Sequence, residues 1–196
     1  NGDVVKDLKG KKVLLRCDLN VPIKDSKIIN DFRLVKARHT IDFLRDVGAK
    51  VILVGHIGKD GLMSLSPVYE YFKKYFPISF TREVLGGNTT SIVEGMNDGD
   101  VVLLENLRQD NGETSNNDIF TKQLASLGDI YVNNAFSVSH REHTSIVGLP
   151  KLLPSYIGDL FQEEVKELSD ALNPPSPALC ILGGAKFSTK KTKPRH

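Results

Sequence analysis

Six short apolar runs, mostly separated by segments with helical spacing, constrain the fold of this 196-residue chain more than any other feature. Most of the runs are continuous rather than alternating in polarity, and all are short. They are Lys12–Asp18, Lys50–His56, Ile78–Thr81, Val101–Glu105, Ile130–Asn134 and Ala178–Leu182. Continuous runs rich in Val, Ile and Leu are typical of strands in a parallel sheet that is covered on both faces. Ile78–Thr81 carries the weakest pattern of the six.

The segments between the runs carry signals for the starts and ends of helices. Asn30 or Asp31 is suited to cap a helix with apolar positions at helical spacing, and Gly48 is suited to end it. Three further helices are predicted. One begins at Ser66-Pro67, an N-cap followed by proline at the first helical position. The others run from Asn116 or Asn117 to Gly128 and from Asp159 to Leu172. Strands that alternate with helices predict an α/β fold. We expect a doubly wound, Rossmann-like parallel sheet of about six strands with helices on both faces.

The composition excludes several classes of protein. Lys and Arg number 26 and Asp and Glu 24, so the net charge of +2 lacks the basic excess of a nucleic-acid partner. No apolar run approaches the roughly 20 residues of a membrane span, so we expect no membrane partner. Two cysteines, Cys17 and Cys180, lie in apolar runs. We expect them to pack as buried hydrophobes in a reducing cytosol, which predicts a cytoplasmic protein.

Polar and basic side chains follow most of the predicted strands directly. They are Asp18 and Asn20 after the first, His56 and Lys59 after the second, Asn106 and Arg108 after the fourth, and Asn134, His140, Arg141 and His143 after the fifth. Ligands of open α/β sheets bind beyond the carboxyl ends of the strands. We therefore predict a crevice that collects these loops: Arg33, Lys59, Arg108, Arg141 and three histidines. Such a crevice suits a small, multiply charged anion. Any one of these residues alone would be interpreted as a solvated loop end, and it is the whole pattern that favours a binding site.

Two motifs leave alternatives open. His140 and His143 have a spacing that metal ligands use, but there is no third ligand nearby and Arg141 would repel a cation, so we predict no metal site. Gly183–Lys186 is similar to a turn that cradles phosphate at a helix start, although it lacks the Walker A spacing. A tight turn between strand and helix explains the same glycines.

Six segments resemble motifs of the phosphoglycerate kinase family, in the order in which that family has them. They are Arg16–Pro22 (similar to Arg-x-Asp-Phe-Asn-Val-Pro), Asp31–Leu34 (at the place of an Arg-Ile motif), Gly55–Lys59 (Ser-His-Leu-Gly-Arg), Leu104–Arg108 (Glu-Asn-Leu-Arg), Asn133–Ser145 (Asn-Asp-Ala-Phe to His-Arg-Ala-His-Ser-Ser) and Ile181–Lys186 (Ile-Leu-Gly-Gly-Ala-Lys). The resemblance runs from about Val5 to Lys190.

The resemblance implies a monomeric glycolytic enzyme with two domains facing each other across a cleft. The N-terminal domain of this family binds 3-phosphoglycerate or 1,3-bisphosphoglycerate, and the C-terminal domain binds Mg-ADP or Mg-ATP. Hinge closure then allows reversible phosphoryl transfer between 1,3-bisphosphoglycerate and ADP, a phosphotransferase reaction with a carboxyl group as acceptor. Such a reaction depends on positioning and charge neutralisation, which the basic crevice would supply.

The resemblance also assigns roles to residues of this sequence. The substrate-binding residues would be Asp18, Asn20, Arg33, His56, Lys59, Arg108 and Arg141. Arg33 and Lys186 would be catalytic, facing the phosphoryl group in transfer. The nucleotide-binding residues would be Gly184, Ala185, Lys186 and Lys190.

Five residues depart from the family pattern. They are Lys59 for Arg, Gln109 for Phe, Asn134 for Asp, Ser137 for Gly and Thr189 for Asp. The change at position 59 replaces a planar fork with a point charge, so we expect weaker or less ordered holding of the substrate.

The resemblance covers only the first half of the family. We expect an N-terminal phosphoglycerate-binding domain at 1–172, an interdomain joint and the start of the nucleotide domain at 173–190, and a tail outside the family pattern at 191–196. The nucleotide domain and its magnesium site would be missing, so the chain alone should not turn over. A non-catalytic, truncated binding or interaction module is the alternative, and an unrelated α/β enzyme of sugar phosphates is a more remote one.

Overall fold

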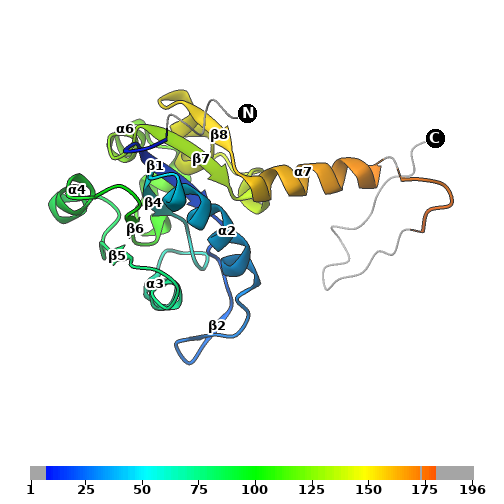
Figure 1. Cartoon of the computed structure of the whole chain (residues 1–196), viewed down its shortest axis with the longest axis horizontal. Coiled ribbons are helices and arrows are strands. Elements are labelled where there is room, and N and C mark those ends of the chain that lie inside the picture. The colour runs from blue at the N-terminus through cyan, green and yellow to red at the C-terminus, as the bar shows by residue number, and fades with distance from the viewer. Residues whose placement is uncertain (1–7, 173, 180–196) are drawn as a thin grey trace.

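A computed structural model describes residues 8–172 and 174–179 of the chain. Six parallel strands form one sheet in the order β5-β6-β4-β1-β7-β8 (Figure 1). The strands are β1 (Lys12–Cys17), β4 (Lys50–Val54), β5 (Ser79–Phe80), β6 (Val101–Leu103), β7 (Ile130–Asn134) and β8 (Ser155–Ile157). A separate antiparallel hairpin joins β2 (Ile23–Lys24) and β3 (Lys27–Ile28). The predicted fold class, an α/β protein with a parallel sheet, is confirmed.

Helices connect the strands. They are α2 (Phe32–Asp46), α3 (Ser66–Phe72), α4 (Gly87–Glu94), α5 (Asn111–Ser115), α6 (Asp118–Ala125) and α7 (Asp159–Leu172). Short 3-10 turns are η1 (Leu107–Gln109), η2 (Phe136–Val138) and η4 (Leu149–Lys151), and η3 (Thr144–Gly148) is a π-helical turn. The predicted caps are correct to within a residue: Asp31 precedes α2 and Asn117 caps α6, but Leu65 rather than Ser66 is the N-cap of α3.

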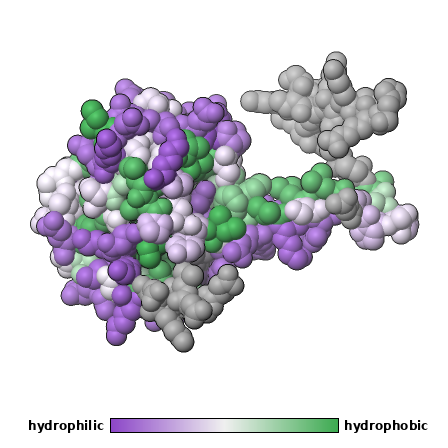
Figure 2. Space-filling view, turned by 90° about the horizontal axis from the view of Figure 1, so that it is seen from above, coloured by the Kyte–Doolittle hydropathy of each residue, from purple (hydrophilic) through white to green (hydrophobic). Residues whose placement is uncertain are grey.

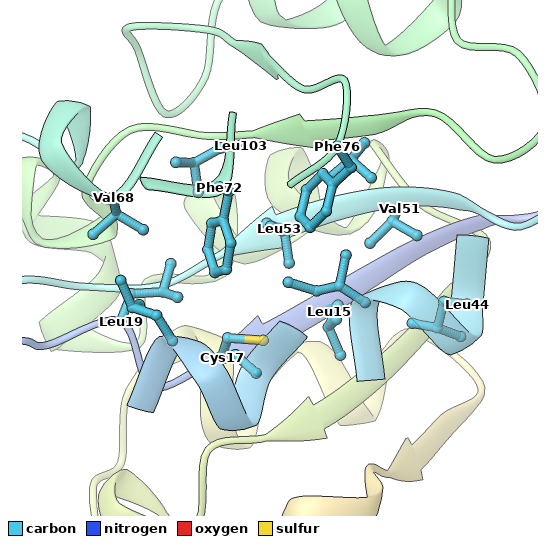
Figure 3. Packing of buried hydrophobic residues seen from close by; sticks show 14 of the residues in the cluster. Leu15, Cys17, Leu19, Leu44, Val51, Leu53, Val68, Phe72, Phe76 and Leu103 are labelled. Carbon is cyan, nitrogen blue, oxygen red and sulfur yellow. The ribbon is translucent and has the colours of Figure 1, made fainter. Parts of the chain in front are cut away.

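Alternate residues of the central strands point to opposite faces of the sheet. Leu15 and Leu53 pack with α2 and α3 in one core cluster, whereas Leu14 and Ile52 pack with α4 and α6 in another. Figure 3 shows the first cluster, in which Phe72 of α3 lies close to Leu53. Because helices cover both faces of the sheet, successive residues of a strand are apolar whichever face they point to. This explains the continuous apolar runs.

Five strands and helices of the described residues have no counterpart among the sequence predictions: β2, β3, α4, α5 and β8. The sixth strand of the sheet is β8, which pairs only with β7 at the sheet edge and is exposed along its length, so it has no apolar run. The run Ala178–Leu182 lies mostly outside the described residues, and its two described residues belong to no strand. The short helix α4 has a Gly-Asn-Thr-Thr-Ser start that lacks strong helix formers, which hid it.

Helix α7 projects away from the body of the molecule (Figure 1). Its start is fixed by Asn134, whose Oδ1 accepts from the Leu160 amide at 3.1 Å, and by an edge-to-face contact of Phe136 with Phe161. Farther along, Val165 and Leu168 are 40% and 48% exposed, and Figure 2 shows apolar surface along this arm. The helix ends where the first predicted domain ends, at Leu172, and that boundary stays a prediction. Within the described part of the chain, no helix has the length and apolar character needed to cross a bilayer.

Candidate functional site: an anion pocket at the strand ends

A pocket of about 280 Å³ lies at the carboxyl ends of the central strands. Loops after β1, β4, β6 and β7 line it, together with the first turn of α2. All seven residues predicted to bind substrate line this one pocket: Asp18, Asn20, Arg33, His56, Lys59, Arg108 and Arg141. Gly58, Ser137, Val138 and His140 complete the lining. The topology thus brings together side chains that are more than 120 residues apart in sequence, because β1 has β4 on one side and β7 on the other.

Asp18 anchors one wall of the pocket. Its carboxylate accepts from Nη1 of Arg33 at 2.9 Å and from the Ser137 hydroxyl at 2.6 Å. Nη1 of Arg33 also donates to the Asn20 carbonyl at 3.0 Å, while the side chain stays 46% exposed. These contacts fix the direction of the Arg33 guanidinium and leave further N–H groups of this cation for a ligand.

Asn106 ties the loops after β4 and β6 to each other. This fully buried amide donates to the carbonyls of Ile57 and Met63, each at 2.8 Å, and its oxygen accepts from the Arg108 amide at 3.2 Å. Gly61 allows the same approach: its φ is +78°, and a Cβ there would collide with the Arg108 carbonyl. Asn106, which the sequence placed among the crevice residues, therefore acts beneath the pocket by positioning Arg108, and Nη1 of Arg108 in turn donates to the Gly58 carbonyl at 2.7 Å.

His56 lies at the floor of the pocket and is 3% exposed. Burial, followed by the nearby Arg16 and Arg108 charges, lowers the pKa of its imidazole to about 2. The pKa of Arg108 is also lowered, first by burial and then by Arg16 and Arg141. His56 is therefore a neutral hydrogen-bonding group at neutral pH, and the charge of the site comes from other residues.

The charge of the pocket is strongly unbalanced. Four cationic side chains, Arg33, Lys59, Arg108 and Arg141, face a single carboxylate, that of Asp18. Cations gathered from separate loops concentrate a positive potential in a small volume. Because Arg guanidinium groups donate in pairs to phosphate and carboxylate oxygens, the arrangement suits a ligand with more than one negative charge.

Another hollow of about 1100 Å³ lies between the β2–β3 hairpin and α3. Its lining combines Lys27 and Lys74 with Asp31 and Glu70. These opposite charges offset one another, so this hollow does not suit a multiply charged anion.

Besides Asn106, two residues expected in the crevice lie elsewhere. The Asn134 amide is buried and bridges Thr40 of α2 and Leu160 of α7, at 2.9 and 3.1 Å. His143 does not line the pocket: its Nδ1 lies 3.8 Å from the Glu113 carboxylate, and burial lowers the pKa of its imidazole although Glu113 opposes this. Of the three histidines expected in the crevice, His56 and His140 line it.

Arg16 is a residue of the site that the sequence analysis did not assign. It is buried in β1 and donates to His56, Ser145 and the Cys17 carbonyl. A charged residue inside an apolar run was the available signal, because a buried charge requires partners. Cys17 beside it is buried in the core cluster, as predicted (Figure 3). Burial raises the pKa of its thiol to about 12.

The residues predicted to bind nucleotide, Gly184, Ala185, Lys186 and Lys190, lie outside the described residues. Over residues 8–172 and 174–179, no group of three or more His, Cys, Asp or Glu side chains is placed to hold a metal ion. The chemistry described below is that of the anion pocket.

Comparison with known proteins agrees with the motif resemblance. A sequence model of the phosphoglycerate kinase family matches residues 3–193. The phosphoglycerate kinase of Clostridium tetani is 46% identical over 195 residues, which are 94% of this chain and 49% of that protein. The relative from Rhizobium leguminosarum is 45% identical, covering 96% of this chain and 49% of that protein. The chain thus spans about half the length of the curated relatives that it matches.

Solved structures give the same result. Phosphoglycerate kinase from Pyrococcus horikoshii has a TM-score of 0.86 and 31% identity, covering 93% of this chain and 48% of that chain. The structure from Coxiella burnetii has a TM-score of 0.79 and 34% identity, covering 94% of this chain and 48% of that chain.

Proposed function

Because this chain belongs to the phosphoglycerate kinase family, we propose that its pocket binds 3-phosphoglycerate or 1,3-bisphosphoglycerate. The chain would supply the substrate-binding half of an enzyme that transfers a phosphoryl group reversibly between 1,3-bisphosphoglycerate and ADP in glycolysis. A monomeric, cytoplasmic protein remains the expectation from the sequence.

One observation carries this proposal: the seven family-pattern residues, from five separate segments, line a single pocket with four cations and one carboxylate. 3-Phosphoglycerate has a phosphate at one end and a carboxylate at the other, so it needs cationic partners at two places. Arg33 comes from the α2 side of the pocket, whereas Arg108 and Arg141 come from the loops after β6 and β7. Two anionic ends can thus be bound by different arginines.

The described residues would contribute positioning and charge neutralisation to the reaction. Arg33, held by Asp18 at 2.9 Å, would neutralise oxygens of the phosphoryl group in transfer. Lys186 is proposed for the same oxygens and lies outside the described residues, as do the positions expected to contact Mg-ADP or Mg-ATP. The magnesium nucleotide, when bound, would be the phosphoryl acceptor as ADP or the phosphoryl donor as ATP. Closure around both ligands would exclude water and limit hydrolysis.

The 196-residue chain by itself is expected to show no turnover. A coupled kinase assay on the purified chain tests this, with the full-length Clostridium tetani protein as positive control. Turnover comparable with that control would contradict the expectation that the other half of the family's length is required.

Binding is tested separately from turnover. Titration of the purified chain with 3-phosphoglycerate is expected to give saturable NMR shifts of the guanidinium groups of Arg33, Arg108 and Arg141. Arg33→Ala and Arg141→Ala should each weaken binding. Lys122→Ala, which removes the same charge from the exposed face of α6, should not. Absence of any saturable shift, or unchanged affinity in both arginine variants, would contradict the assigned pocket.

A non-catalytic interaction module is the second candidate function. The exposed apolar residues Val165, Leu168 and Leu172 on α7 favour it, because a solvated helix face is normally polar. The intact mass of the natural protein distinguishes the two candidates. A product that continues beyond His196 into a nucleotide domain supports the enzyme, whereas a product that ends there supports the module.

A further inference from the structure

A chain of buried polar groups lies beneath the anion pocket. Arg16 of β1, Glu113 of α5 and Ser145 of η3 are all buried, and none of them lines the pocket. His56 is the member of the chain that does line it. Burying an Arg and a Glu costs free energy unless their hydrogen bonds are made. The partners of these two buried groups therefore show how the groups are held beneath the pocket.

The direction of each hydrogen bond follows from the chemistry of the donors. An Arg guanidinium has N–H donors and no acceptor. The contact of 2.9 Å between Nη2 of Arg16 and Nδ1 of His56 therefore requires that Nδ1 accept. A neutral imidazole has one accepting and one donating nitrogen, so the proton of His56 is on Nε2.

Ser145 and Glu113 fix the position of Arg16. Nε of Arg16 donates to the Ser145 hydroxyl at 3.0 Å. That hydroxyl then gives its single proton to Oε1 of Glu113 at 2.6 Å, and Oε2 of Glu113 accepts from the Ser145 amide at 3.0 Å. Nη1 of Arg16 donates to the Cys17 carbonyl at 2.6 Å, so each nitrogen of the guanidinium has a partner.

We propose that Glu113, Ser145 and Arg16 form a positioning relay that holds His56 in its Nε2–H tautomer, so that His56 presents a neutral N–H donor to the anion in the pocket. None of the three contacts the anion; they act through His56. The identity of that anion rests on the proposed function. The tautomer does not, because Arg16 sets it in the protein without ligand.

The relay is tested by the nitrogen spectrum of His56 in the full 196-residue chain. With ¹⁵N-labelled histidine at pH 7, the wild-type chain is expected to show a pyridine-type Nδ1 and a pyrrole-type Nε2. Ser145→Ala removes the hydroxyl between Arg16 and Glu113. It should give a mixture of tautomers and weaken 3-phosphoglycerate binding about tenfold, the effect of leaving one buried hydrogen-bonding group unpaired.

Thr144→Val is the matched control. Thr144 is the neighbour of Ser145 and equally buried, but its hydroxyl contacts Thr121 and the Gly112 carbonyl rather than Arg16. This variant should keep the wild-type His56 spectrum and the wild-type affinity. A change in this variant equal to that of Ser145→Ala would overturn the relay, because it would show a general effect of packing.

Three further outcomes decide the proposal. A pyrrole-type Nδ1 in the wild-type chain overturns it without any variant. If Ser145→Ala does not fold, Glu113→Gln replaces it. The carboxylate oxygens of Glu113 each accept from one group of Ser145, whereas the NH₂ group of Gln is a donor and accepts from neither. An unchanged His56 spectrum in that variant overturns the relay. A wild-type chain that shows the expected tautomers and their loss in the variants, but binds no 3-phosphoglycerate, supports the relay and contradicts the proposed function.

Discussion

At the scale of single residues, the pocket combines exposed cations at its rim with neutral or paired groups at its floor. Arg33, Lys59 and Arg141 are exposed, whereas His56 and Asp18 are buried. An exposed guanidinium remains hydrated until a ligand arrives, and a buried imidazole stays neutral because burial penalises its charged form. The positive charge of the site and its buried neutral donor therefore come from different residues.

The buried imidazole of His56 should make the stability of the chain depend on pH. Its pKa is about 2 in the folded protein and 6.5 ordinarily, so below pH 6.5 the unfolded chain binds a proton that the folded chain does not. This group should lower the free energy of unfolding by about 2 kcal/mol between pH 7 and pH 5. His56→Gln removes the titration and keeps an acceptor for Arg16. Urea unfolding at both pH values measures the difference, and equal pH dependence of the two proteins would refute the assignment.

Lys59 should limit the affinity of the pocket. Its ammonium is a point charge on a flexible chain, whereas an Arg at this position could donate two parallel hydrogen bonds to a phosphate or carboxylate. Lys59→Arg is expected to tighten 3-phosphoglycerate binding about fivefold, or ~1 kcal/mol, measured by calorimetric titration. Lys122→Arg makes the same change on α6, away from the pocket, and should leave the affinity as it is. Equal affinity of wild type and Lys59→Arg would show that this side chain does not reach the ligand.

The sequence predicted which residues line the pocket better than how they are held. The family motifs contain all seven proposed substrate residues, because these motifs consist of the residues expected to contact the ligand. The same motifs do not report the hydrogen bonds beneath it, such as that from Ser137 to Asp18, since these depend on loops that meet only in the folded chain. Asn106 and Asn134 show the limit. Asn106 follows β6 and Asn134 is the last residue of β7, yet both are buried and hold loops and helices together through hydrogen bonds.

At the scale of elements, those with a regular apolar pattern in the sequence were the ones predicted. Strands β1 and β4 are covered on both sides and were evident as apolar runs, and α2 buries one regular stripe that includes Leu34, Ile41 and Leu44. The edge strand β8 and the short helix α4 bury little, so composition alone carries no signal for them. Tertiary pairing with β7, rather than local propensity, makes β8 a strand.

The N-cap of α6 offers a test at this scale. Oδ1 of Asn117 accepts from the amides of Ile119 and Phe120, each at 3.0 Å, and so satisfies two donors that have no partner within the helix. Asn117→Ala should lower the free energy of unfolding by about 1 kcal/mol, measured by urea unfolding. Asn111→Ala, at an exposed position of α5, is the control and should cost less. A loss in the control as large as that in Asn117→Ala would show that the cap is not the cause.

At the scale of the whole molecule, a net charge of only +2 produces little long-range attraction for an anion. The attraction must come from the four cations of the pocket, which lie close together at the carboxyl ends of the strands. Raising the ionic strength from about 0.01 M to about 0.15 M shortens the Debye length from about 30 Å to about 8 Å. Affinity for 3-phosphoglycerate should therefore fall with salt, although the protein as a whole is nearly neutral.

The position of a charge, rather than the net charge of the protein, should determine how steeply the affinity for 3-phosphoglycerate falls with salt. Arg141→Ala and Lys122→Ala change the net charge equally, but only Arg141 lines the pocket. Calorimetric titrations over the same range of salt are expected to give a shallower dependence for Arg141→Ala and the wild-type dependence for Lys122→Ala. If both variants shift the salt dependence alike, the anion responds to the overall field of the protein, and the local pocket described above is not its binding site.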